Sequence, residues 1–243
     1  MKVLRRSLAC WASIAILAAI GSARGAEFNE TFEGYAVGSN LHGQGGWKGW
    51  DNDPAGGALI SDAAFLGGTR AVAIAGSSDL VHEFSGVLGG VWTLQIDQFV
   101  PSDAAGESFL ILLNKYRDGG VADFDNWSSQ VGVYPSVGQV KSDFNGDGNG
   151  IVAPLKKGSW ATWAFTLDLE RNEVWEYYDG KLLVVQPWQS GGANALAAID
   201  LYGNNSSTVY YDNLRVSKVP EPSVLSLGVV AALSFLIVGR GRR

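Results

Sequence analysis

The chain has 243 residues, with 24 acidic and 18 basic side chains and a formal net charge of −6. Seven of the basic residues lie among the first 24 or the last four residues, so the middle of the chain is more acidic than the whole. Such a segment repels nucleic acid and anionic membrane surfaces, which excludes both as its partners. The one cysteine, Cys10, lies near the N-terminus, so thiol chemistry and cysteine-ligated metals are excluded for the middle segment.

The first 25 residues have the order of a secretory signal peptide. Basic residues precede an apolar run from Leu8 to Ile20, and small residues follow it. Cleavage after Gly25 fits this pattern, and cleavage after Ala23 fits nearly as well. A membrane-spanning helix is the alternative, but a span needs about 20 apolar residues. We therefore predict a signal peptide over residues 1–25.

A different pattern ends the chain. Pro220-Glu221-Pro222 precedes an apolar run over residues 224–238, and three arginines follow among the last four residues. By the positive-inside rule the arginines stay in the cytoplasm. Together with an export signal, this predicts a transmembrane helix over residues 224–238 and places residues 26–218 outside the inner membrane.

These three parts, in this order, resemble the PEP-CTERM sorting signal of Gram-negative bacteria, here over residues 219–243. The resemblance implies an exosortase as a partner, which cuts near Pro220, Glu221 and Pro222 after the secretion machinery has exported the chain. It also implies transient contact with the inner membrane and a final place at the cell surface or in the extracellular matrix, near extracellular polysaccharide. An ordinary tail anchor is the alternative.

Between these ends the apolar residues alternate with polar ones. Trp92, Leu94 and Ile96 alternate with polar residues, and the segment that begins at Trp163 does the same. A period of two is typical of half-buried strands in an antiparallel sheet. We predict strands over the following ranges: 28–32, 58–66, 71–74, 80–84, 92–96, 108–115, 128–134, 160–170, 173–178, 181–186 and 208–216. Many short strands with glycine-rich turns predict an all-β antiparallel sandwich or jelly roll.

Two segments narrow the choice among all-β sandwich folds. Glu176-Tyr177-Tyr178-Asp179-Gly180-Lys181-Leu182 resembles a hairpin of concanavalin A-like and laminin-G-like jelly rolls. The segment from Tyr210 to Val216 resembles the closing strand of such domains, which lies beside the first strand. The resemblance implies a concanavalin A-like jelly roll over residues 26–218.

No complete catalytic motif is present. Laminarinase-type hydrolases share this fold and carry a Glu-x-Asp-x-x-Glu strand, but the closest window, from Glu170 to Glu176, has a different spacing and contains a turn. A solvated hairpin explains that window better. Only His42 and His82 are available for Ser-His-Asp or zinc chemistry, and a Gly-x-Ser-x-Gly elbow is absent. We therefore expect no enzyme, although carboxylates from distant strands remain an alternative.

One loop begins like a calcium site. Asp143, Asn145 and Asp147 place oxygen donors at alternate positions, and a glycine stands sixth. The twelfth position is Pro154, so the bidentate glutamate of an EF-hand is missing. The segment is therefore either a Ca²⁺ site completed by a distant carboxylate or an Asn/Asp/Gly turn.

Tryptophans supply the second kind of candidate site. Trp92, Trp163 and Trp175 lie on alternating strands and are expected in the core. Other tryptophans lie in loops, where a flat apolar face can stack on a sugar while nearby Asp and Asn bind its hydroxyl groups. The candidate carbohydrate-binding residues are Trp47, Trp50, Asp51, Asn126 and Trp127. Trp188, after Pro187, is either another such contact or a lid on the sandwich edge.

Three functions follow from these features. The first is an exported, non-catalytic surface or matrix protein that binds polysaccharide. The second is a secreted glycan hydrolase or lyase with an unrecognised carboxylate site. The third is a structural envelope component without a ligand. Loop tryptophans gathered on one concave face would favour the first, and two buried carboxylates in a cleft would favour the second.

Overall fold

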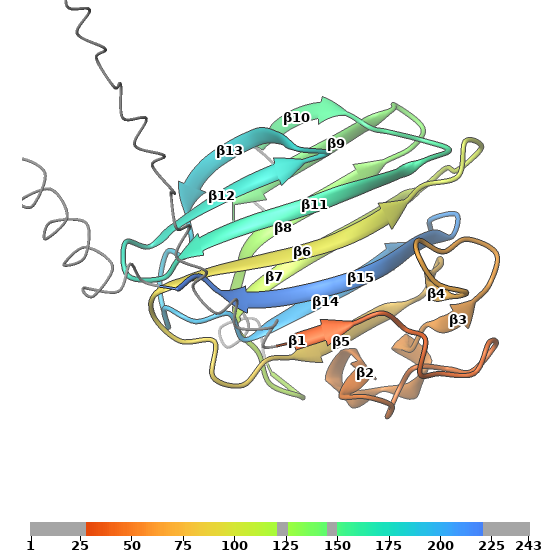
Figure 1. Cartoon of the computed structure of the whole chain (residues 1–243), viewed down its shortest axis with the longest axis horizontal. Coiled ribbons are helices and arrows are strands. Elements are labelled where there is room, and N and C mark those ends of the chain that lie inside the picture. The colour runs from red at the N-terminus through yellow and green to blue at the C-terminus, as the bar shows by residue number, and fades with distance from the viewer. Residues whose placement is uncertain (1–27, 121–125, 145–149, 221–243) are drawn as a thin grey trace, which may run out of the picture. The chain divides into compact units, whose positions relative to one another are not determined.

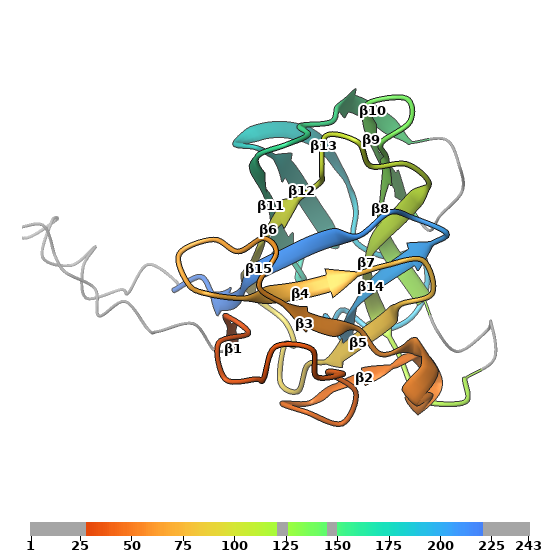
Figure 2. The same cartoon turned by 90° about the vertical axis from the view of Figure 1, so that its right-hand side faces the viewer.

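The computed structural model describes residues 28–120, 126–144 and 150–220. The predicted signal peptide lies outside these ranges, and so do all but the first two residues of the predicted sorting segment. The described residues contain no helix that is long and apolar enough to cross a membrane. What they form is a β-sandwich of two antiparallel sheets (Figures 1 and 2).

The first sheet has eight strands and contains both ends of the described chain. Its strands in spatial order are β13 (Lys181–Pro187), β12 (Glu173–Tyr178), β11 (Trp160–Asp168), β6 (Val91–Phe99), β15 (Val209–Lys218), β4 (Ala71–Ile74) and β3 (Leu59–Ser61), with β1 (Phe28–Glu30) paired to β15. Phe28 lies opposite Val216 and Glu30 opposite Leu214. The prediction that the closing strand lies beside the first strand is therefore confirmed.

The second sheet has seven strands and packs face to face on the first (Figure 2). Its strands in order are β10 (Ile151–Pro154), β9 (Gln139–Phe144), β8 (Asn126–Tyr134), β7 (Glu107–Lys115), β14 (Ala198–Asn204), β5 (Asp79–Glu83) and β2 (Trp47–Gly49). Two short 3-10 turns, η1 (Trp50–Asn52) and η2 (Pro54–Gly56), follow β2 directly.

The core between the sheets follows the alternation of the sequence. Leu94 and Ile96 of β6, with Trp163 and Phe165 of β11, face inward from the first sheet and are fully buried. Burial of such side chains stabilises the fold by about 1.5–3 kcal/mol each. The second sheet differs because its outer face also carries apolar side chains. They form a separate cluster of Val81, Ile111, Leu113, Tyr116 and Ala198.

Several predicted strands match closely, among them β4 and β12, whose bounds are those expected. The strand predicted over 58–66 is shorter and ends at Ser61, because the glycine-rich segment after it forms bends. The described ranges also contain four strands that were not predicted, namely β2, β9, β10 and β14. β14 lies in the middle of the second sheet, between β7 and β5, and positions the site described below.

One inward position was predicted wrongly. Trp92 and Trp163 are buried as expected, but Trp175 lies on the outer side of β12 and is only partly buried. Val174 and Tyr178 face the core and set the phase of the strand, so Glu176 also points inward and is fully buried. The interpretation of this segment as a solvated hairpin is therefore wrong for Glu176.

Candidate functional site

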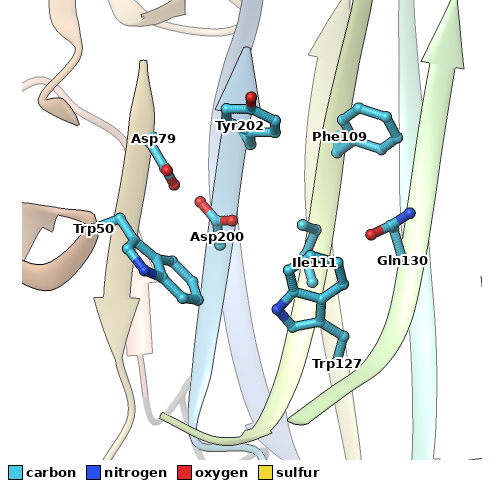
Figure 3. Close-up of a pocket in the computed structure, with 8 residues that line it drawn as sticks. All are labelled: Trp50, Asp79, Phe109, Ile111, Trp127, Gln130, Asp200 and Tyr202. Atoms are coloured by element: carbon cyan, nitrogen blue, oxygen red, sulfur yellow. The ribbon is translucent and has the colours of Figure 1, made fainter. Parts of the chain in front are cut away.

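A pocket of about 450 Å³ lies on the outer face of the second sheet. We call it the outer-face pocket. It spans four adjacent strands, β5, β14, β7 and β8, with η1 at one end. Its lining residues are Trp50, Asp79, Phe109, Ile111, Trp127, Gln130, Asp200 and Tyr202 (Figure 3). Its size lies within the usual range of small-molecule sites, about 300–1,000 Å³.

Strand register brings these residues together. Tyr202 of β14 lies opposite Asp79 of β5 on one side and opposite Phe109 of β7 on the other. Two positions earlier on the same face, Asp200 lies opposite Ile111 of β7. Since alternate residues of a strand point to the same face, one polar and aromatic row forms across the sheet.

A β-bulge turns Trp127 into the pocket. Leu112 pairs with Ser129, but the next residue, Leu113, pairs with Trp127, so Ser128 has no partner in the ladder. An extra residue of this kind reverses the phase of a strand. Trp127 therefore reaches the same face as Gln130, and its side chain is 41% exposed.

Trp50 enters the pocket from the other end. Its ring meets Tyr116 edge-on, with ring centroids 4.9 Å apart. The Tyr116 hydroxyl accepts a hydrogen bond from the backbone N–H of Asp51 (3.0 Å), and Asp51 Oδ1 accepts one from the backbone N–H of Gly119 (2.9 Å). These contacts fix η1 against the loop after β7. Asp51 itself lines a neighbouring depression together with Asp79.

Two carboxyl groups meet at the floor of the pocket. Asp79 and Asp200 point toward one another, beside Trp50 and below Tyr202 in Figure 3. Asp200 is only 2% exposed. No N–H or O–H donor among the described residues reaches Oδ1 of either residue. A buried acceptor without a donor costs free energy unless a proton or a ligand satisfies it.

Burial makes both carboxyl groups hard to ionise. Burial raises the pKa of Asp79, and the nearby negative charge of Asp51 acts in the same direction. Burial raises the pKa of Asp200 more strongly, and the charge of Asp79 adds to this effect. Two carboxylates in contact resist joint ionisation, so one of them keeps a proton. Asp200, the more deeply buried partner, is the harder of the two to ionise.

The structure separates the predicted sugar-binding residues. Trp50 and Trp127 line the same pocket, as the hypothesis of a shared face requires. Trp47 does not, because it is 1% exposed in the core and its indole Nε1 donates a hydrogen bond to Glu30 Oε2 (3.3 Å). The expectation of an exposed loop tryptophan therefore does not hold for Trp47, whose ring offers no open face to a sugar. Asn126 belongs to β8, but its side chain lies outside the described part of the structure.

Trp188 is also fully buried, and its indole N–H donates to the backbone oxygen of Ala195 (2.9 Å). Of the two interpretations of Trp188, its burial agrees with a lid on the edge of the sandwich and not with a sugar contact. Trp188 therefore packs against the protein itself and has no exposed ring face for a ligand.

The predicted calcium ligands are only partly described. Asp143 lies on strand β9, is 3% exposed and forms an ion pair with Lys141 (3.4 Å). Asn145 and Asp147 lie outside the described residues, so a Ca²⁺ site there stays a prediction. Within the described ranges, no group of three or more His, Cys, Asp and Glu side chains is arranged to hold a metal ion.

The carboxyl pair was missed because strand β14 was missed. The signal in the sequence is the segment from Ala198 to Tyr202, where a lone aspartate, Asp200, interrupts an apolar run. A charged residue inside such a run is unusual unless the residue is paired. Nothing in the sequence, however, identifies Asp79 as its partner.

Comparisons with known proteins give the fold of this domain and no more. No family model and no curated protein matches the sequence. Among solved structures, the chain is similar to a cellulose induced protein, Cip1, with 9% identity, a TM-score of 0.52 and coverage of 79% of this chain and 98% of that one. A sialidase matches with 11% identity and a TM-score of 0.50 over 75% of this chain, which spans only 18% of the sialidase.

A carbohydrate binding module, CBM66 from Bacillus subtilis, matches with 14% identity and a TM-score of 0.45, over 71% of this chain and 96% of the module. Identities this low carry no information on activity. The described residues form a two-sheet antiparallel β-sandwich of the concanavalin A-like kind.

Proposed function

We propose that this chain is an exported, non-catalytic surface or matrix protein whose sandwich binds a glycan in the outer-face pocket. The observation that carries the proposal is the placement of Trp50 and Trp127 around the acceptor pair of Asp79 and Asp200. Aromatic faces pack against the C–H faces of a sugar ring, while carboxyl oxygens accept hydrogen bonds from its hydroxyl groups. The pocket offers both kinds of contact side by side, from η1 and from four strands of the second sheet.

A glycan array probed with the purified chain tests this proposal. Trp127→Ala removes an exposed ring of the pocket, and binding is expected to weaken about tenfold or more. Trp175→Ala is the matched control, because Trp175 lies on the outer side of the other sheet. If binding is lost in the first variant and kept in the second, the pocket is the site. If no glycan binds, sugar recognition is wrong and a structural role without a ligand takes its place.

A glycan hydrolase or lyase is the second candidate, because two carboxyl groups do meet in a pocket. Retaining glycosidases hold their carboxyl groups about 5–5.5 Å apart so that the sugar fits between them. Asp79 and Asp200 point toward one another on adjacent strands instead of facing each other across a cleft, and this arrangement favours binding over cleavage. New reducing ends or unsaturated sugars that appear with the wild type and disappear in Asp79→Asn would instead favour a hydrolase or lyase.

We also propose that an exosortase processes the C-terminus. The last backbone hydrogen bond of the described chain runs from Val219 N–H to the Val91 oxygen (2.8 Å), and the exposed Pro220 follows it. A cut near Glu221 would thus leave the sandwich intact. Replacing Pro220, Glu221 and Pro222 by alanine in an exosortase-containing host should leave an uncut chain in the inner membrane. Cleavage that is unchanged would favour an ordinary tail anchor.

A further inference from the structure

The outer-face pocket contains two acidic side chains that no basic side chain of the described residues pairs with. No lysine, arginine or histidine of the described residues forms an ion pair with Asp79 or Asp200. Lys48 of β2 lies on the neighbouring strand, but its ammonium group is bound to Glu83 and Asp118. The carboxyl pair therefore has no cationic partner in the part of the chain that the structure describes.

The other groups around the pair do not change this balance. η1 adds the negative charge of Asp51, whose field reaches Asp79. β7 contributes the apolar side chains of Phe109 and Ile111, and β8 contributes the neutral Gln130 and Trp127. On β14, the Tyr202 hydroxyl lies 3.4 Å from Asn204 Oδ1. The pocket is thus acidic and rich in acceptors, with aromatic walls.

From this arrangement we propose that the outer-face pocket binds a glycan that carries a free, protonated amino group, with the ammonium held between Asp79 and Asp200. The inference rests on the proposed glycan binding and names its ligand class, an amino sugar without an N-acetyl group. Asp200 supports it directly, because it is almost fully buried, lines the pocket and has an Oδ1 that receives no hydrogen bond.

The chemistry of an ammonium group matches each part of the pocket. It has three N–H donors and no acceptor, as the lysine side chain has, so it satisfies both carboxyl groups at once. Its positive charge allows both aspartates to ionise, and the proton that one of them kept passes to the solvent. The faces of Trp50 and Trp127 also attract a cation. An N-acetyl group offers one N–H and no charge, and a uronate would be repelled.

Calorimetry with a matched pair of ligands tests the inference. The purified chain is titrated with a glucosamine oligosaccharide and with its N-acetylated counterpart of the same length, in buffers of different ionisation enthalpy. The free amine is expected to bind about tenfold or more tightly than the acetylated form, since charge-assisted hydrogen bonds are the stronger kind. Binding of the amine, but not of the acetylated form, should release a proton, and its affinity should rise with pH until the amine itself loses its charge.

Variants separate this site from general attraction to an acidic protein. Asp200→Asn removes the carboxyl group that is harder to ionise, so proton release should vanish and the preference for the amine should shrink. Asp79→Asn provides a second test if the first variant does not fold. Asp62→Asn is the control, because it removes one exposed charge from the loop after β3, on the other sheet. It should keep both the preference and the proton release.

Equal affinity for the two oligosaccharides, or binding of the amine without proton release, would overturn the inference. Other array glycans that still bind in a Trp127-dependent manner would leave the proposed function intact in that case. If no glycan of any kind binds, both proposals fail. If Asp62→Asn loses the preference for the amine as fully as Asp200→Asn does, the amine is attracted to the overall charge of the protein. That outcome would also overturn the assignment of the ammonium site to Asp79 and Asp200.

Discussion

The carboxyl group of Glu176 on β12 accepts a hydrogen bond from the hydroxyl group of Ser129 on β8, so a polar contact joins the two sheets inside the apolar core. Ser142 of β9 donates to the other carboxyl oxygen, and Gln186 Nε2 of β13 donates to Oε1 (2.8 Å). Burial raises the pKa of Glu176, although these three hydrogen bonds act in the opposite direction. The core therefore contains an acid that resists ionisation.

Glu176→Gln is expected to change how stability depends on pH. Because the pKa of Glu176 is higher in the folded than in the unfolded state, the wild type loses stability as pH rises from about 4.3 through the folded pKa. Glutamine cannot ionise. The difference in unfolding free energy between variant and wild type, measured by urea denaturation across this range, should therefore shift in favour of the variant as pH rises.

The comparison with the wild type at each pH cancels the other buried acids, such as Asp212, whose pKa burial also raises. A difference that stays constant with pH would show that Glu176 is not the titrating group. Glu176→Ala should instead cost about 2–4 kcal/mol near pH 4, because it leaves a cavity and buried donors without an acceptor. This cost should fall as pH rises, because alanine, like glutamine, cannot ionise.

Alanine substitutions of Trp47 and Trp127 should differ sharply in their effect on the unfolding free energy. Trp47→Ala removes a fully buried ring and is expected to lower the unfolding free energy by about 3–5 kcal/mol. Trp127→Ala removes a ring that is 41% exposed and should cost about 1 kcal/mol or less. Chemical denaturation of the two variants measures this difference. Similar losses in both would contradict the placement of the two side chains.

Gly49 directly precedes η1, the turn that carries Trp50 into the outer-face pocket. A Cβ at this position would lie 1.9 Å from the backbone oxygen of Asp53, so Gly49→Ala must displace η1 and with it Trp50. We expect a loss of about 1–3 kcal/mol in stability and weaker glycan binding. Gly34→Ala is the control, since its Cβ would meet nothing within 4 Å. The same loss in the control would mean that crowding at Gly49 is not the cause.

The sequence alone determined the class of the fold and much of its strand content. Alternation with period two and glycine-rich turns are local signals, and they correctly predicted an antiparallel sandwich and strands such as β4 and β12. The pairing of the first and last strands also followed from the sequence, through the resemblance of the segment from Tyr210 to Val216. These features depend on neighbouring residues or on a recognisable segment.

The tertiary structure decided the inner or outer position of single residues. Trp175 and Glu176 exchanged their expected places because Val174 and Tyr178 set the phase of β12. Trp127 faces the pocket because of a bulge that appears only when β8 pairs with β7. A one-residue change of phase moves a side chain to the other face, and hydrophobicity alone does not fix that phase.

The site itself depends on contacts between distant segments. Asp79 and Asp200 lie far apart in the chain and meet only because β14 pairs with β5. The composition shows that the chain is acidic, but only the register places two carboxyl groups in one pocket beside Trp50. Since a carboxyl group buried without a cation must share a proton or bind a ligand, that long-range pairing, rather than any local motif, creates the chemistry proposed for this protein.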